Sequence, residues 1–147
     1  MKYFTIEELS KSDVARKKGI ANLPAGEARE NLVALVENIL DPLREAWGKP
    51  IVVNSGYRSE ELNTIVGGSA TSQHLRGQAA DIEAVSRSRE DNERLFNLIR
   101  SLGLPFDQLI DEFGYDWVHV SYDPSRNRRA VIEAARVKGR TVYLPRR

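Results

Sequence analysis

The chain has no cysteine and only two histidines among its 147 residues. The absence of cysteine excludes disulfides, thiolate nucleophiles and thiolate metal sites. Any bound metal must therefore be held by histidine or carboxylate side chains. This makes the surroundings of His74 and His119 the first place to look for a functional site.

Long apolar runs are also missing from the sequence. No segment approaches the ~20 apolar residues that a membrane-spanning helix needs. The N-terminal stretch MKYFTIEELSKSD carries acidic side chains where a secretory signal would need an apolar run. We therefore expect no membrane insertion and no signal peptide. The protein should be cytoplasmic as synthesised, and would act on a cell wall only if released or exported.

An excess of one charge is likewise absent, because 22 basic residues stand against 21 acidic ones. Basic residues do gather in the C-terminal segment, residues 123–147, where they would favour nucleic acid or an anionic cell wall. A solvated basic face is the simpler interpretation, since no platform of stacking aromatic residues accompanies them. We expect no nucleic-acid partner.

Length and composition indicate a single domain spanning residues 1–147, which we expect to be a monomer. Residues 1–26 have only a ragged apolar rhythm and predict an irregular segment with short helices. From residue 27 to Trp47, apolar side chains recur every three or four positions, which predicts a long helix. Pro42 removes a backbone donor inside this helix, so we expect a kink or break near Asp41.

The rest of the chain alternates apolar runs with turns. A second amphipathic helix should follow residues 86–91 and end at Gly103. Strands are predicted over residues 51–53, 78–83, 108–110 and 117–122. Residues 130–135 fit either a strand or a helix, and residues 141–144 form a last short apolar run. Two main helices packed on such strands make an α+β domain, in which we expect a small, mostly antiparallel sheet flanked by helices.

Both histidines have surroundings that suit a metal site. His74 lies in a glycine-bearing loop within the stretch SQHLRGQAAD, and Asp81 ends that stretch on the strand that follows. Alternation along residues 116–121 directs His119 to one face of its strand. Two imidazoles and one carboxylate, with a fourth position left for water, are the ligand set of a catalytic zinc site.

A catalytic metal site also needs a proton acceptor and a group that stabilises negative charge. Asp116, three residues before His119, is one candidate general base, and Glu112 is a competing one. Arg58 lies at a strand end, where a fixed cation can stabilise an oxyanion. Taken singly, each residue has an ordinary interpretation, such as a solvated histidine or a surface ion pair.

Four motifs taken together carry a resemblance to a known family: SGYRS at 55–59, N-x3-GGS at 63–69, SQHLRGQAAD at 72–81 and DWVHVS at 116–121. In this combination and order the chain resembles the zinc D-Ala-D-Ala carboxypeptidases, peptidoglycan peptidases that include phage endolysins. The resemblance implies a fold like that of the hedgehog domain and the D-Ala-D-Ala peptidases. It also implies hydrolysis of an amide bond in peptidoglycan stem or cross-link peptides, by a carboxypeptidase or an endopeptidase.

The resemblance implies roles for individual residues. Zinc would be bound by His74, Asp81 and His119. Asp116 would match the family's general base, with Glu112 as the residue that could exchange roles with it. Arg58 would polarise the scissile carbonyl, and Tyr57 and Ser72 would line the substrate cleft. An alternative is a non-catalytic zinc-containing module that binds the cell wall or has a structural role, but such a module has no use for an acid beside a ligand or for Arg58.

Overall fold

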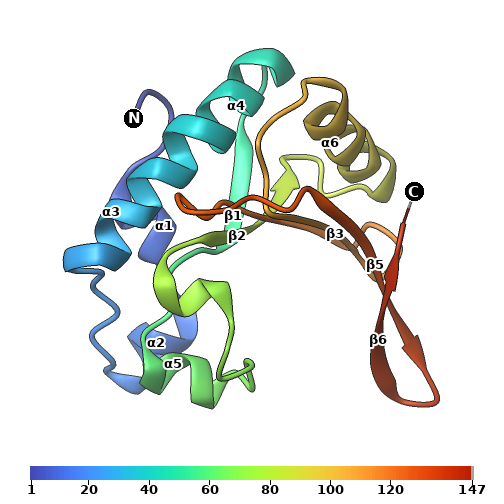
Figure 1. Ribbon diagram of the computed structural model, residues 1–147. Coiled ribbons are helices and arrows are strands. Elements are labelled where there is room, and N and C mark those ends of the chain that lie inside the picture. Colours follow the sequence, from blue (N-terminus) through green and yellow to red (C-terminus); the bar gives the residue numbers. More distant parts are fainter. Residues whose placement is uncertain (147) are drawn as a thin grey trace.

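The computed structural model describes residues 1–146, so that Arg147, the last residue of the basic C-terminal segment, lies outside the described residues. The chain folds into an α+β structure with one six-stranded sheet in the order β1-β2-β4-β3-β5-β6 (Figure 1). The strands are β1 (Ile51–Ser55), β2 (Ala79–Ala84), β3 (Gln108–Glu112), β4 (Trp117–Ser121), β5 (Ala130–Val137) and β6 (Arg140–Pro145). All the predicted strands are confirmed, and residues 130–135 belong to a strand rather than a helix.

The sheet is mixed, which corrects the expectation of a mostly antiparallel one. β1 with β2, β2 with β4, β3 with β4 and β5 with β6 pair antiparallel, but β3 and β5 run parallel. Residues 122–129 cause this parallel pair. They carry the chain from the end of β4 past β3, so that β5 lies on the side of β3 away from β4. After this crossover, β5 runs in the same direction as β3.

Short capped helices form the N-terminal segment, as predicted for residues 1–26. They are α1 (Ile6–Ser10) and α2 (Asp13–Lys18). Thr5 caps α1 by accepting a hydrogen bond from the backbone N–H of Glu8, and Ser12 caps α2 in the same way. The remaining helices are α3 (Gly26–Leu35), the π-helical turn η1 (Val36–Leu40), α4 (Asp41–Trp47), α5 (Glu60–Ile65), the 3₁₀ turn η2 (Gln73–Arg76) and α6 (Arg89–Ser101).

The predicted long helix is formed by α3, η1 and α4, and it stays helical past Pro42. The α-helical hydrogen-bond pattern gives way to a π turn in the five residues Val36–Leu40, directly before α4. There the backbone N–H of Asp41 bonds to the carbonyl of Val36, five residues back. Pro42 lies in the first turn of α4, where its missing N–H is tolerated. The irregularity thus occurs where it was predicted, as a change of helix type rather than a break.

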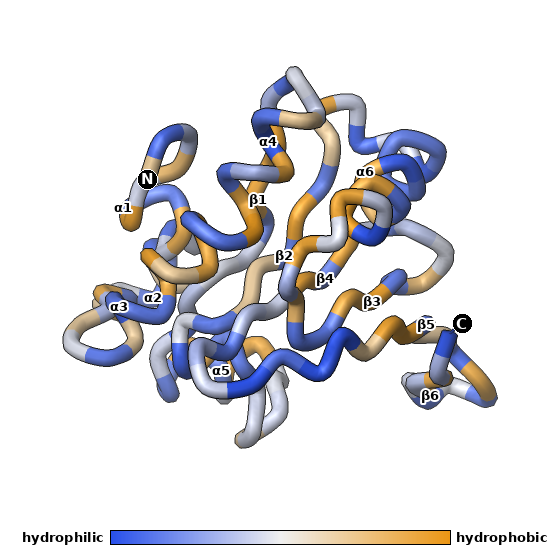
Figure 2. Tube along the Cα trace, turned by 45° about the horizontal axis from the view of Figure 1, so that its top comes forward, coloured by the Kyte–Doolittle hydropathy of each residue, from blue (hydrophilic) through white to orange (hydrophobic). Residues whose placement is uncertain are grey.

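The hydrophobic core lies between one face of the sheet and the helices α3, α4 and α6 (Figure 1). Side chains that alternate along the central strands point into it, including Ile82, Leu109, Val118 and Val120, none of which is exposed. Figure 2 shows hydrophobic stretches on these strands and on α4 and α6, whereas the chain leading into β5 is hydrophilic. The opposite face of the sheet carries polar side chains together with a few apolar ones.

A hairpin of β5 and β6 extends away from the helices at the C-terminal end of the chain (Figure 1). No helix within residues 1–146 is long and apolar enough to cross a membrane.

Candidate active site

Strand register brings Asp81 and His119 together on the face of the sheet opposite the core. The two residues are direct partners in the antiparallel pair of β2 and β4. Residues that face each other in this way point to the same side of a sheet. Nδ1 of His119 lies 2.9 Å from Oδ1 of Asp81. The predicted alternation along residues 116–121 is thus confirmed.

A tight turn before β2 delivers His74 to the same carboxylate. His74 lies in η2, and Gly77 ends this turn with a left-handed φ of 71°. A side chain at Gly77 would also collide with α3, because a Cβ there would lie 2.2 Å from the carbonyl oxygen of Ala28. The packed loop buries His74, and its Nε2 lies 3.3 Å from Oδ2 of Asp81.

A backbone carbonyl fixes the orientation of the His74 ring. Nδ1 of His74 lies 2.7 Å from the carbonyl oxygen of Gly56. A carbonyl oxygen only accepts hydrogen bonds, so Nδ1 donates to it and Nε2 is the ring nitrogen that faces Asp81. Gly56 itself is required here, because a Cβ would lie 2.1 Å from the carbonyl oxygen of Leu9. Hydrogen bonds of this kind orient histidines that bind metals.

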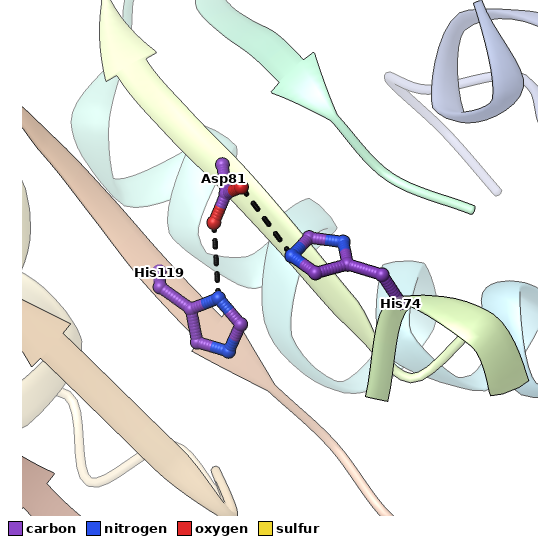
Figure 3. A group of neighbouring side chains, drawn as sticks. All are labelled: His74, Asp81 and His119. Carbon is purple, nitrogen blue, oxygen red and sulfur yellow. Dashed lines mark hydrogen bonds and ion pairs between the residues drawn. The ribbon is translucent and has the colours of Figure 1, made fainter. Parts of the chain in front are cut away.

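Together, His74, Asp81 and His119 form a group able to hold a metal ion. One ligand atom from each lies within 4.8 Å of the others. Figure 3 shows Asp81 between the two imidazoles, with His74 reaching it from η2 and His119 from the neighbouring strand. Two nitrogen donors and one carboxylate oxygen are a ligand set that zinc favours. The residues therefore fit the metal that the sequence predicted.

The electrostatics of the group favour a charged carboxylate. Burial alone would raise the pKa of Asp81, but the charges and hydrogen bonds of His74 and His119 lower it by more, so that its pKa lies well below the ordinary value. Asp81 is thus ionised, as a metal ligand has to be, over the whole physiological pH range.

Arg58 lies beside the metal-binding group and is held in place by its neighbours. Its backbone N–H donates to the carbonyl of His74 at 3.0 Å, and its Nη1 donates to Oδ1 of Asn63 at 3.2 Å. Gly68 leaves room for this contact, since a Cβ there would lie 2.0 Å from Oδ1 of Asn63 and 2.7 Å from Nη1 of Arg58. Burial lowers the pKa of the guanidinium, and the charge of Asp81 opposes that shift. The cation is therefore held ready for an anionic group.

The metal-binding group opens into a cleft of about 1050 Å³. The cleft is also lined by Arg58, Ser72 and Glu112, so that three further predicted site residues share it with the histidines. Tyr57 lies apart from them, in an adjoining hollow of about 400 Å³ that Arg58 and Asp81 also line. Ser72 has a second role, because its hydroxyl accepts the backbone N–H of His74 at the start of η2.

The two candidate bases lie in different environments. Glu112, at the end of β3, is only 7% exposed and lines the cleft together with His119. Burial raises its pKa to about 7, and the negative charges of Asp81 and Asp111 add to this, against the lowering effect of His119. The Asp116 side chain is 56% exposed, lies 3.7 Å from Nη2 of Arg89, and borders a separate hollow. The structure thus places Glu112, and not Asp116, in the cleft.

Some contributors to the site give little or no signal in the sequence. The carbonyl of Gly56 acts through the backbone, so its residue type gives no signal of the role. Asn63 and Gly68, which position Arg58, both lie in the N-x3-GGS motif, so that motif was the available signal. Asn22 joins the N-terminal segment to the loop around Arg58, donating to the carbonyls of Ser10 and Tyr57.

Comparisons with known proteins agree with the resemblance that the motifs indicated. A family model described as peptidase M15 matches residues 2–121. A zinc D-Ala-D-Ala carboxypeptidase from Streptomyces albus G is 39% identical over 85 residues, which make up 57% of this chain and 32% of that protein. The chain thus spans about a third of the length of this relative. Since the family model covers most of the chain, including every residue of the metal-binding group, the chain belongs to the peptidase M15 family.

Proposed function

We propose that this chain is a zinc-dependent peptidase that hydrolyses an amide bond in the peptides of peptidoglycan. The observation that carries the proposal is the group of His74, Asp81 and His119 on the floor of a cleft that also contains Glu112 and Arg58. The family match and the name of the Streptomyces albus G relative support both the metal and the substrate class. The fold we propose is the one shared by the D-Ala-D-Ala peptidases and the hedgehog domain.

Zinc would be held by Nε2 of His74, a carboxylate oxygen of Asp81 and Nδ1 of His119. When bound, it supplies a Lewis acid that brings the pKa of a water molecule towards about 7. The protein prepares the site for this ligand set. The Gly56 carbonyl binds Nδ1 of His74 so that Nε2 faces the metal site, and the two histidines keep Asp81 ionised.

We assign the role of general base to Glu112. Its carboxylate lines the cleft beside His119 and is largely buried, a position from which it would take a proton from the attacking water and give it to the leaving amine. Asp116, the base first expected, has the family spacing from His119 but an exposed side chain directed to another hollow. We propose that Asp116 supports the loop between β3 and β4 through its contact with Arg89.

Arg58 would stabilise the negative charge that develops on the scissile carbonyl oxygen. It lines the cleft next to Asp81, and Asn63 holds its guanidinium from behind. A fixed cation of this kind needs no rearrangement during the reaction, which is the basis of electrostatic catalysis. Ser72 would line the substrate cleft, and Tyr57 would line the adjoining hollow that also contains Arg58.

The bond that is cut can be identified directly by digesting purified peptidoglycan with the zinc-loaded protein. Mass analysis of the released fragments separates loss of a terminal D-alanine, as a carboxypeptidase would cause, from cleavage within the stem or cross-link, as an endopeptidase or endolysin would cause. We expect fragments that disappear when zinc is removed with a chelator. Intact peptidoglycan from several sources would instead favour a non-catalytic zinc-containing wall-binding module.

A further inference from the structure

The β5–β6 hairpin forms one wall of the cleft, although it lies outside residues 2–121, the part of the chain that matches the family. Ile132 of β5, together with Thr141 and Tyr143 of β6, lines the same cleft as Glu112 and His119. These three residues are uncharged, and Tyr143 brings an aromatic ring to this side of the cleft. The hairpin thus supplies part of the cleft from outside the segment that matches the family.

Strand register connects Tyr143 to Glu112 across the sheet. Glu112 is the direct partner of Ala134 in the pair of β3 and β5, and Ala134 is the direct partner of Tyr143 in the pair of β5 and β6. The three residues therefore form one row on a single face of the sheet. Since alanine ends at Cβ, no bulky side chain separates Tyr143 from Glu112.

Tyr143 is not needed for the core. Its side chain is 59% exposed, whereas a structural tyrosine buries most of its ring. Partial burial of Tyr143 raises its pKa, and the charges of Glu112 and Asp81 raise this pKa further. The hydroxyl therefore stays protonated at neutral pH and is available as a hydrogen-bond donor near the carboxylates of the site.

We propose that Tyr143 binds the peptide substrate, with its ring packed against the bound peptide and its hydroxyl donating a hydrogen bond to a peptide carbonyl on the Glu112 side of the cleft. Exposed aromatic residues with a polar tip are well suited to this task, because they bury a large area and still make a directional contact. The inference rests on the proposed function for the class of substrate. It adds a substrate-binding residue from a segment outside the family match.

The test compares Tyr143→Ala and Tyr143→Phe with Leu144→Ala in the full chain. Leu144 is also exposed, at 47%, but as the next residue along β6 it points to the opposite face of the strand, away from the cleft. We expect Tyr143→Ala to raise KM for a peptidoglycan stem pentapeptide ending in D-Ala-D-Ala by about tenfold, with kcat changed less than about twofold. Tyr143→Phe, which loses only the hydroxyl, should raise KM about threefold. Leu144→Ala should leave KM and kcat unchanged.

A binding measurement separates failure of this inference from failure of the proposed function. The dissociation constant of the same pentapeptide is measured by calorimetry for the zinc-loaded wild type and for each variant. Weaker binding to Tyr143→Ala supports the inference even if the wild type cleaves nothing. Equal binding and equal KM in wild type and Tyr143→Ala overturn it, even if the wild type is an active peptidase. Absence of pentapeptide binding to the wild type overturns it as well.

Discussion

Gly56 and His74 are joined by a hydrogen bond of 2.7 Å between a backbone carbonyl and Nδ1 of the imidazole. This bond leaves Nε2 of His74 directed at Asp81, which in turn contacts His119. Hydrogen bonds and strand register therefore orient the three ligand side chains towards one another. Preorganisation of this kind reduces the cost of ordering the ligands when a metal binds.

The first prediction concerns metal content. We expect about one zinc ion per chain in protein purified without chelator, because the site offers three preoriented ligands. His74→Ala and His119→Ala should each lose the metal, while Asp116→Asn, which changes a side chain outside the cleft, should retain it. Elemental analysis by mass spectrometry measures this. Unchanged zinc in both histidine variants would remove the proposed metal site.

The second prediction concerns the position of Arg58. In Gly68→Ala the added Cβ would collide with Asn63 and Arg58, so the guanidinium must move. We expect turnover to fall by roughly 10- to 100-fold with zinc content unchanged. Gly67→Ala is the control. Its φ of 75° makes alanine unfavourable at this position, but nothing lies within 4 Å of the new Cβ, so the added methyl group does not contact Arg58. Equal turnover in both variants would show that the position of Arg58 does not matter for the reaction.

Several features of the site followed from the sequence, and others did not. The alternation along β4 predicted the direction of His119, and Gly77 with the small residues after it predicted the turn between His74 and Asp81. The choice between Glu112 and Asp116 depends on how the β3–β4 connection folds. There the backbone N–H of Asp116 bonds to the carbonyl of Glu112, leaving the Asp116 side chain outside the cleft. Sequence spacing alone carries no information about such a turn.

In the fold, too, the features set by neighbouring residues were predicted, and the pairing of strands distant in the sequence was not. Strands and helices were predicted because apolar periodicity and turn residues are local signals. The parallel pairing of β3 with β5 was not, because it depends on the path of residues 122–129 past a strand that is already in place. The π turn before Pro42 was anticipated only as an irregularity, since one proline can be accommodated by several helix distortions.

The third prediction concerns the pH dependence of stability in the metal-free protein. Burial raises the pKa of Glu112 from 4.5 to about 7. Between these values the folded protein keeps a proton that the unfolded chain releases, so this group lowers the free energy of unfolding as pH rises. Above about pH 7 the decrease in the free energy of unfolding should reach on the order of 3 kcal/mol. This decrease should be absent in Glu112→Gln.

Urea unfolding of chelator-treated wild type and Glu112→Gln at about pH 5 and about pH 8 measures this difference. The variant should gain stability relative to the wild type as pH rises. A constant difference between the two proteins across this range would show that Glu112 is not buried as described.

We propose that His74, Asp81 and His119 hold the metal of a peptidase whose general base is Glu112. The most direct test is the rate of product release from peptidoglycan peptides by zinc-loaded wild type, Glu112→Gln and Asp116→Asn at equal zinc content. We predict that Glu112→Gln is slower by about 100-fold or more and that Asp116→Asn stays within about threefold of the wild type. Full activity in Glu112→Gln, with activity lost in Asp116→Asn, would contradict this account and return the role of base to Asp116.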